Sequence, residues 1–256
     1  MKVVILAGGL PSTLIEEEEK LPKPMVEIGN RPILCHIMKY YAYYGYNEFI
    51  VCTGYKGEMI KDYFMNFYIY QSDITVDLQS NQIAIHRKQT EDWNVSVIDT
   101  GLHSTIAERI KMAQTYLNHE PFIVVYGDCV ADINISEMVK MHQEGNRIAT
   151  IAVTHPTGRN ETLPINNEGR FFTQKEKSDE HCAWVNACNM IFEPEIIAYL
   201  EQNPNLLNAD MLNKMIKEEQ IQPYQHKGFW LPMETIRDKK LLETYWQNGT
   251  APWKIW

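Results

Sequence analysis

Two glycines and a lysine near the start of the chain have the residue types of a phosphate-binding loop. Leu6-Ala7-Gly8-Gly9 follows a short apolar run, and Lys23-Pro24-Met25 comes soon afterwards. Glycines after a buried strand let the backbone approach a nucleotide closely, and a lysine further along can close over phosphate oxygens. The glycines match neither the G-x-x-x-x-G-K-[ST] nor the G-x-G-x-x-G pattern, and a tight structural turn explains them about as well. By itself this segment is only a weak indication of a nucleotide site.

A carboxylate is the second candidate for chemistry. Asp128 directly follows an apolar run that predicts a central strand, and Asp132 comes shortly after it. A carboxylate at the end of a strand is well placed for Mg²⁺, which prefers oxygen ligands and in nucleotide sites uses one or two carboxylates. Gly-Asp pairs are also common in turns, so a turn is an equally good interpretation. Glu234 is a candidate partner for Asp128, although several other acids qualify.

Other common kinds of site lack their residues. The eight histidines are dispersed and form no H-E-x-x-H pair, and His181-Cys182 with Cys188 lacks a fourth zinc ligand. A G-x-S-x-G nucleophile elbow does not occur. The aromatic residues Tyr245, Trp246, Trp253 and Trp256 fit either a buried core or, as the minority interpretation, an oligomer contact.

The composition is that of a folded protein with an acidic surface. Hydrophobic residues make up 45% of the 256 residues, and the net charge of −9 argues against broad binding to nucleic acid or to anionic membranes. The longest apolar run near the start is too short to span a bilayer or to serve as a secretory signal. Five scattered cysteines, an odd number without a C-x-x-C pair, favour a reducing cytoplasm.

Strand and helix patterns alternate along the chain. Short β-branched runs at 2–6, 49–53, 122–126 and 148–153 predict strands. Helical spacing is found after Pro32, ending at Gly45, and at 57–66, 106–117, 136–143, 194–202, 209–219 and 235–247. Period-two alternation between 74 and 99 predicts half-exposed antiparallel strands. We therefore expect an α/β fold with a mixed, mostly parallel, Rossmann-like sheet flanked by helices, in one domain over 1–256 with a decorated C-terminal half.

These motifs resemble the glucose-1-phosphate cytidylyltransferase family of sugar nucleotidyltransferases over nearly the whole chain. The resemblance is carried mainly by the stretches 23–29 (KPMVEIG), 54–57 (GYKG), 228–239 (GFWLPMETIRDK) and 251–256 (APWKIW). It implies a nucleotidyltransferase fold and the transfer of CMP from CTP to a phosphorylated acceptor, with release of pyrophosphate. It also implies Mg²⁺, a homo-oligomer and a place in the synthesis of cell-surface polysaccharide precursors.

The resemblance also implies roles for individual residues. Lys23, Asp128 and Glu234 would be catalytic, Lys23 at the triphosphate and the two acids as metal ligands. The nucleotide would be bound by Leu6, Ala7, Gly8, Gly9, Lys23, Thr100, Ser104, Arg109 and Gly127. The acceptor would be bound by Arg159, Lys177 and Asn186.

The chain departs from the family pattern in two places. The family's first loop continues Gly-Gly-x-Gly-Thr-Arg, whereas Pro11 and Thr13 replace its third glycine and its arginine, so that Lys20 or Lys23 would have to supply the missing charge. On the acceptor side Ala187 and Cys188 replace glycines, as do Ala107 and Glu108, and Asn160-Glu161-Thr162 replaces Phe-Gly-Ala.

Two interpretations follow from these departures. One is an active cytidylyltransferase with a changed acceptor, for example another sugar phosphate, a polyol phosphate or the phosphoglutamine of capsule phosphoramidate synthesis. The other is a nucleotide-binding homologue that has lost turnover. The retained charges of Lys23, Asp128, Lys177 and Glu234 favour the active enzyme.

Overall fold

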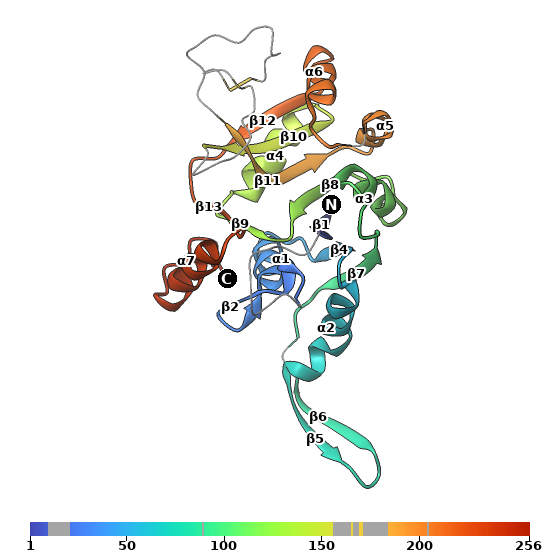
Figure 1. Cartoon of the computed structure of the whole chain (residues 1–256), viewed down its shortest axis with the longest axis vertical. Helices are drawn as coiled ribbons and strands as arrows, with labels where there is room; N and C mark the ends of the chain where they lie inside the picture. The colour runs from blue at the N-terminus through green and yellow to red at the C-terminus, as the bar shows by residue number, and fades with distance from the viewer. Residues whose placement is uncertain (10–20, 89, 156–164, 166–168, 171–183, 204) are drawn as a thin grey trace.

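The computed structural model describes residues 1–9, 21–88, 90–155, 165, 169–170, 184–203 and 205–256. Its centre is a seven-stranded sheet with the order β12-β10-β11-β8-β1-β4-β7 (Figure 1). The strands are β1 (Lys2–Ala7), β4 (Glu48–Thr53), β7 (Asn94–Asp99), β8 (Phe122–Tyr126), β10 (Ala149–Thr154), β11 (Val185–Phe192) and β12 (Ile221–Gln225). Only β11 of these strands runs antiparallel to its neighbours, which confirms the mixed, mostly parallel sheet.

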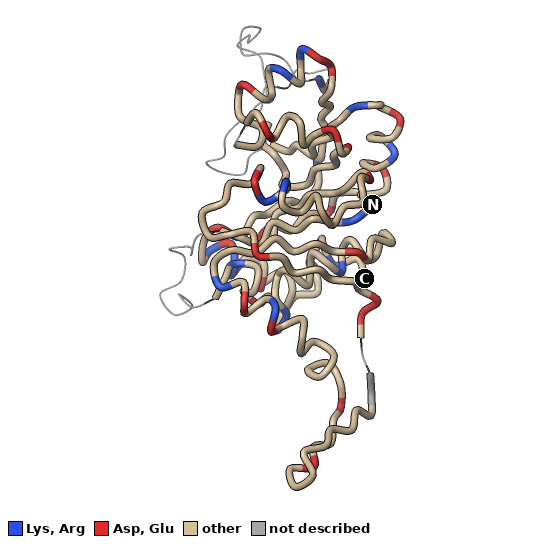
Figure 2. The backbone as a smooth tube through the Cα atoms, turned by 90° about the vertical axis from the view of Figure 1, so that its right-hand side faces the viewer, with Lys and Arg blue, Asp and Glu red and all other residues tan. Residues whose placement is uncertain are grey.

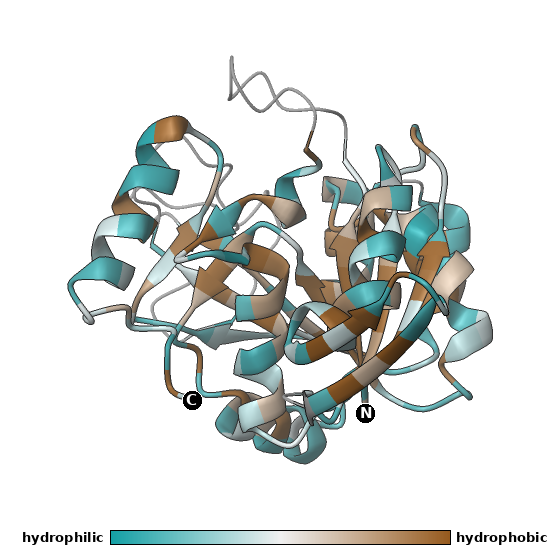
Figure 3. Cartoon of the chain, turned by 90° about the horizontal axis from the view of Figure 1, so that it is seen from below, coloured by the Kyte–Doolittle hydropathy of each residue, from teal (hydrophilic) through white to brown (hydrophobic). Residues whose placement is uncertain are grey.

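Helices cover both faces of this sheet. They are α1 (Ile33–Tyr43), α2 (Gly57–Tyr70), α3 (Ile106–Ala113), α4 (Ile135–Gly145), α5 (Ile196–Gln202), α6 (Ala209–Lys217) and α7 (Ile236–Gln247), with 3-10 turns η1 (Lys23–Met25) and η2 (Gln114–Tyr116). Successive β1 residues point to opposite faces, so that Val3 and Ile5 join a core with α1 and α4, whereas Val4 joins a core with α3, α5 and α6. Figure 3 shows the apolar strands enclosed by more polar helices.

The predicted strands between 74 and 99 do not supply the antiparallel part of the sheet. Strands β5 (Ser72–Asp77) and β6 (Gln82–Lys88) pair only with each other in a ribbon that projects from the body (Figure 1), while β7 joins the sheet in parallel. The antiparallel strand is β11, which the sequence analysis did not predict. Alternation in 74–85 therefore arises from a separate ribbon with both faces open.

Two helix ends differ from the sequence-based expectation. Helix α3 ends at Ala113, and η2 continues the predicted segment as a tighter 3-10 turn. Helix α4 continues past the predicted end at residue 143 and includes Gly145, and Asn146 after it takes the left-handed conformation with φ of 52°. A Cβ on Gly145 would lie 2.2 Å from the Gln222 side chain, so this glycine allows close packing on β12. Gly45, with φ of 87°, is the left-handed residue expected after α1.

Two short ribbons fix the surroundings of the sheet. Strands β2 (Glu27–Ile28) and β3 (Arg31–Pro32) form one, and β9 (Cys129–Ala131) pairs with β13 (Trp230–Pro232) in the other. The C-terminal aromatic residues pack against α1, where Trp253 is fully buried and its Nε1 donates to His36 Nδ1 at 3.3 Å. The interpretation of Trp253 as a core residue is confirmed.

Charged residues of both signs are interspersed over the body of the molecule (Figure 2). No helix among the described residues combines the length and the apolar character needed to cross a membrane.

Candidate functional site

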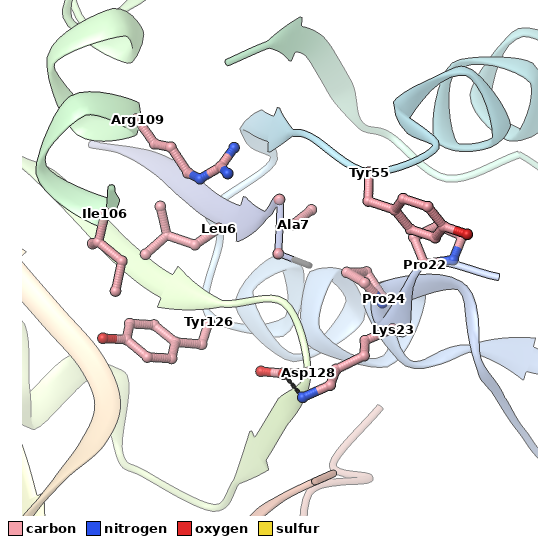
Figure 4. Close-up of a pocket in the computed structure, with 12 residues that line it drawn as sticks. Leu6, Ala7, Pro22, Lys23, Pro24, Tyr55, Ile106, Arg109, Tyr126 and Asp128 are labelled. Atoms are coloured by element: carbon pink, nitrogen blue, oxygen red, sulfur yellow. Dashed lines mark hydrogen bonds and ion pairs between the residues drawn. The ribbon is translucent and has the colours of Figure 1, made fainter. Parts of the chain in front are cut away.

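A cavity of about 230 Å³ opens at the carboxyl ends of β1 and β8. Its walls are formed by Leu6, Ala7, Gly8, Gly9, Pro22, Lys23, Pro24, Tyr55, Ile106, Arg109, Tyr126 and Asp128 (Figure 4). From β1 the chain first adds β4 and β7 on one side of β1 in the sheet, and it later adds β8 on the other side. The cavity therefore lies at the point where the strand order reverses. Open α/β sheets bind ligands at this position.

Lys23 and Asp128 meet at one end of the cavity. The Lys23 Nζ lies 3.4 Å from Asp128 Oδ2, and both side chains are about a quarter exposed, 28% and 26%. Pro22 and Pro24 constrain the backbone on both sides of Lys23, and η1 closes with a hydrogen bond from Val26 N to Lys23 O. Burial raises the pKa of the Asp128 carboxyl, and the Lys23 ammonium opposes that rise. The pair therefore places one cation and one carboxylate at the cavity wall.

The β9–β13 ribbon brings Glu234 next to Asp128 along the backbone. Pro232 is paired with Cys129, and Met233 N donates to Asp128 O at 2.8 Å. Glu234 is exposed, and its N–H donates to Asp238 Oδ2 at the start of α7. The structure thus brings together the backbone segments of two acids that are far apart in sequence, although Glu234 does not line the cavity.

Arg109 occupies the opposite end of the cavity. Its Nη1 donates to Thr53 O at 3.0 Å and to Thr100 Oγ1 at 2.5 Å, and its Nη2 donates to Leu102 O at 3.4 Å. The side chain is buried, which lowers its pKa, and all three of these partners are uncharged oxygens. The guanidinium is therefore held rigidly at the cavity by neutral acceptors, and its remaining donor capacity suits a ligand.

Gly8 and Gly54 make room for this guanidinium. A Cβ on Gly8 would lie 2.1 Å from Arg109 Nη1, and one on Gly54 would lie 3.1 Å from it and 2.9 Å from Gly101 O. A Cβ on Gly9, in contrast, would meet no atom within 4 Å. Gly8 thus has a packing role, and Gly9 leaves backbone open to the cavity, so both interpretations of the glycine pair apply, one to each residue.

Thr100, Ser104 and Gly127 lie behind the cavity wall. The Thr100 hydroxyl donates to Thr53 O at 2.6 Å while it accepts from Arg109, and the Ser104 hydroxyl donates to Thr100 O. Gly127 N donates to Leu6 O at 3.0 Å. These residues hold the walls in place rather than face the cavity.

The acceptor residues are described only in part. Asn186 is at a bulge of β11, where its Oδ1 accepts from Cys188 N at 2.8 Å, and it does not line the cavity. Cys188 has a left-handed φ of 62°. Arg159 and Lys177 lie outside the described residues, as do Pro11, Thr13, Lys20 and 160–162.

Two tyrosines of the cavity were missed by the sequence analysis. Tyr55 follows Gly54 in the GYKG motif, which was quoted without a role for its tyrosine, and Tyr126 was assigned only to a strand. Tyr126 ends β8 and points toward Ile106 in Figure 4. The sequence did contain a signal for Tyr126, which lies two positions before Asp128. It is the last side chain on its face of the strand and therefore lies at the strand end, where the cavity opens.

Comparisons with known proteins show the family of the chain. A family model described as "Nucleotidyl transferase" matches residues 2–247. The glucose-1-phosphate cytidylyltransferase of Salmonella typhimurium is 41% identical over 258 residues, which cover 100% of both chains. The mannose-1-phosphate guanylyltransferase catalytic subunit beta of Danio rerio is 26% identical over 93% of this chain and 62% of its own.

A solved structure has the same fold. The apo form of a UDP-glucose pyrophosphorylase superposes with a TM-score of 0.71 over 97% of this chain and 99% of its own, at 15% sequence identity. Likeness at this level of identity shows the fold alone.

Proposed function

Because this chain belongs to the nucleotidyltransferase family, we propose that it transfers CMP from CTP to the phosphate of a small acceptor and releases pyrophosphate. The observation that carries the proposal is the cavity at the ends of β1 and β8, with the Lys23–Asp128 pair at one end and the Arg109 guanidinium at the other. Full-length similarity to a glucose-1-phosphate cytidylyltransferase supports cytidine as the base.

The triphosphate would lie between the Gly9 backbone and Lys23. A phosphate oxygen of the acceptor forms a bond to the α-phosphorus of CTP, and the bond from that phosphorus to the bridging oxygen breaks. Pyrophosphate leaves with the electron pair. Such transfers depend on positioning and on neutralising charge, so Lys23 would act by stabilising negative charge on the phosphates.

Asp128, with Glu234 beside it, would hold a divalent metal ion, which we propose to be Mg²⁺. Asp128 presents a partly exposed carboxylate at the cavity, and no cluster of three metal-ligating side chains is found in the described part of the chain. These residues fit a site in which the substrate supplies the remaining metal ligands. Mg²⁺ is commonly held by one or two carboxylates together with substrate phosphates. When bound, the ion would neutralise charge that develops on the phosphate oxygens.

Arg109 would recognise the base, with Leu6, Ala7 and Gly8 beside it. Cytosine has acceptor atoms at O2 and N3, and a rigid guanidinium can donate to them. Thr100 and Ser104 then serve as positioning residues, because they hold Arg109 and its loop. Gly127 would support the floor of the cavity through Leu6.

The acceptor is proposed to contact Arg159, Lys177 and Asn186. Ala187 and Cys188 add side chains beside Asn186, where the family pattern has glycines, and this added bulk favours an acceptor other than glucose 1-phosphate. Another sugar phosphate, a polyol phosphate and phosphoglutamine remain the candidates. A product of this class would be a precursor for cell-surface polysaccharide.

A homo-oligomer and a cytoplasmic location belong to the same proposal. The projecting ribbon and α2 expose large apolar side chains, among them Met65, Tyr70, Leu78 and Ile83. Exposed apolar patches of this kind are typical of protein interfaces. Four free thiols in the described residues, Cys35, Cys52, Cys129 and Cys188, are in keeping with a reducing compartment.

The test is pyrophosphate release from CTP and Mg²⁺ with a panel of acceptors: glucose 1-phosphate, other sugar phosphates, polyol phosphates and phosphoglutamine. Turnover with one of them is expected, and Lys23→Ala is expected to abolish it. Lys39→Ala is the matched control, because it removes a lysine paired with Glu91 away from the cavity. Silence across the panel, with CTP binding intact in a thermal-shift assay, would favour the impaired homologue. Silence without CTP binding would reject both interpretations.

A further inference from the structure

The Tyr126 hydroxyl is a polar group of the cavity without a hydrogen-bond partner among the described residues. None of the described residues donates a hydrogen bond to this oxygen or accepts one from it. In the part of the chain that the structure describes, the enclosed side-chain atoms without a hydrogen-bond partner are Asp132 Oδ1, His142 Nε2 and Trp230 Nε1. The Tyr126 oxygen is not among them, so it reaches open space. The ring itself is packed between the two cores. A rigid ring with a free hydroxyl at a cavity wall is suited to binding a ligand.

The position of Tyr126 indicates which ligand it meets. Tyr126 lies on the strand that separates β1 from β11, and Val125 is paired with Asn189 of β11. Arg109 and the glycines are at the β1 and β4 side, whereas Asn186 and Cys188 are on β11. Tyr126 therefore stands between the proposed cytidine end and the β11 bulge, on the side from which an acceptor would approach Asp128.

The chemistry of the phenol restricts the group that Tyr126 binds. A neutral hydroxyl both donates and accepts, which matches a hydroxyl on a substrate. The negative charge of the triphosphate would be met by Lys23 instead of Tyr126.

Resting on the proposed cytidylyltransferase function, we propose that Tyr126 hydrogen-bonds a hydroxyl on the carbon skeleton of the acceptor and selects for polyhydroxylated phosphates. Among the candidate acceptors this favours a sugar or polyol phosphate over phosphoglutamine. The residue would position the acceptor without taking part in the transfer itself.

The test compares Tyr126→Phe with the wild type in the pyrophosphate-release assay, using the best sugar or polyol phosphate and its monodeoxy analogues. We expect the variant to lose about tenfold in kcat/KM through a higher KM for the acceptor, with an unchanged KM for CTP. The deoxy analogue that lacks the hydroxyl bound by Tyr126 should be a poor substrate for the wild type. The variant should use this analogue no less efficiently than the wild type does. Tyr199→Phe, which removes a hydroxyl bonded to Glu218 at the surface, is the matched control.

Calorimetric titration of the same acceptors in the presence of CTP keeps the test independent of turnover. Weaker binding of the hydroxylated acceptor to Tyr126→Phe would support the inference even if the wild type released no pyrophosphate. An unchanged acceptor affinity, a changed KM for CTP alone, or the absence of binding by any hydroxylated phosphate would overturn it. An active wild type with an unaffected variant would overturn this inference and leave the proposed function in place.

Discussion

Replacing Gly8 with alanine is expected to displace Arg109 from the cavity wall. The added Cβ would lie 2.1 Å from Nη1 and 2.6 Å from Cζ of Arg109, and 2.9 Å from Gly54 N. Normal contact distances require the guanidinium to retreat by about 1 Å, which is enough to break hydrogen bonds of ordinary length. The Gly54 backbone blocks relief in the other direction, so the arginine has to leave the position in which Thr53 and Thr100 hold it.

The magnitude follows from the bonds that are lost. Hydrogen bonds of a charged group contribute roughly 1.5–3 kcal/mol each, and overpacking alone typically costs roughly 1–3 kcal/mol. Because the displaced guanidinium regains water at the cavity, we expect the free energy of unfolding to fall by about 2–4 kcal/mol. The KM for CTP should rise at least about tenfold, since Arg109, which we propose to contact the base, would be displaced from it.

Urea denaturation and steady-state kinetics measure these two effects. Gly9→Ala is the matched control and should leave stability unchanged, because its Cβ meets no atom within 4 Å. In the double variant Gly8→Ala/Arg109→Ala, most of the clash is gone, so the two losses of stability should be strongly non-additive. Additive losses, or a Gly8→Ala variant as stable as the wild type, would refute the reasoning.

Three further predictions concern pH, metal binding and backbone strain. Burial lowers the pKa of His36 from 6.5 to about 4. Between these pH values the unfolded chain therefore binds more protons than the folded chain. The free energy of unfolding should fall by up to roughly 3 kcal/mol as the pH drops from 6.5 to 4. Urea titrations at pH 7 and 4.5 measure this loss, and a similar loss in His36→Gln would show that other groups cause it. Lys23→Gln removes the ammonium group that pairs with Asp128, so that the lysine no longer competes with a metal ion for this carboxylate. Mn²⁺ binding to the ligand-free protein, measured by electron paramagnetic resonance, should become about tenfold tighter. An unchanged affinity, or the same gain in Lys39→Gln, would contradict this competition between Lys23 and the metal ion. Cys188→Gly should raise the free energy of unfolding by about 1 kcal/mol in urea titrations, because glycine accepts the φ of 62° without strain; a decrease would mean that the thiol's packing outweighs the strain.

The sheet could be predicted where its strands have a local signature. Runs such as 122–126 are β-branched and end at residues typical of turns, so their place in a parallel sheet was confirmed. Strand β11 was missed because all but one of its residues are buried, which removes the period-two pattern that marks a half-exposed strand. The single-domain organisation over 1–256 stays a prediction.

The site was predicted less completely than the fold. Lys23 and Asp128 were identified from their types and positions, and the structure pairs them. The neighbourhood of Asp128 and Glu234 depends on the β9–β13 ribbon, whose strands are three residues long and carry no recognisable pattern. Tyr126 was assigned to the sheet because strand periodicity does not tell a core side chain from one that faces a cavity.

The β9–β13 ribbon also affects the order in which parts of the site form during folding. Its two strands come from distant parts of the chain, and Met233 N reaches Asp128 O only when they have paired. Contacts of such large sequence separation are slow to form, because the entropy of closing the intervening loop opposes them. The strands that carry the Asp128 end of the cavity can therefore pair during synthesis well before residue 234 exists. The residues that line the cavity all precede residue 129, so only the proposed contribution of Glu234 to metal binding would arrive as a late event of folding.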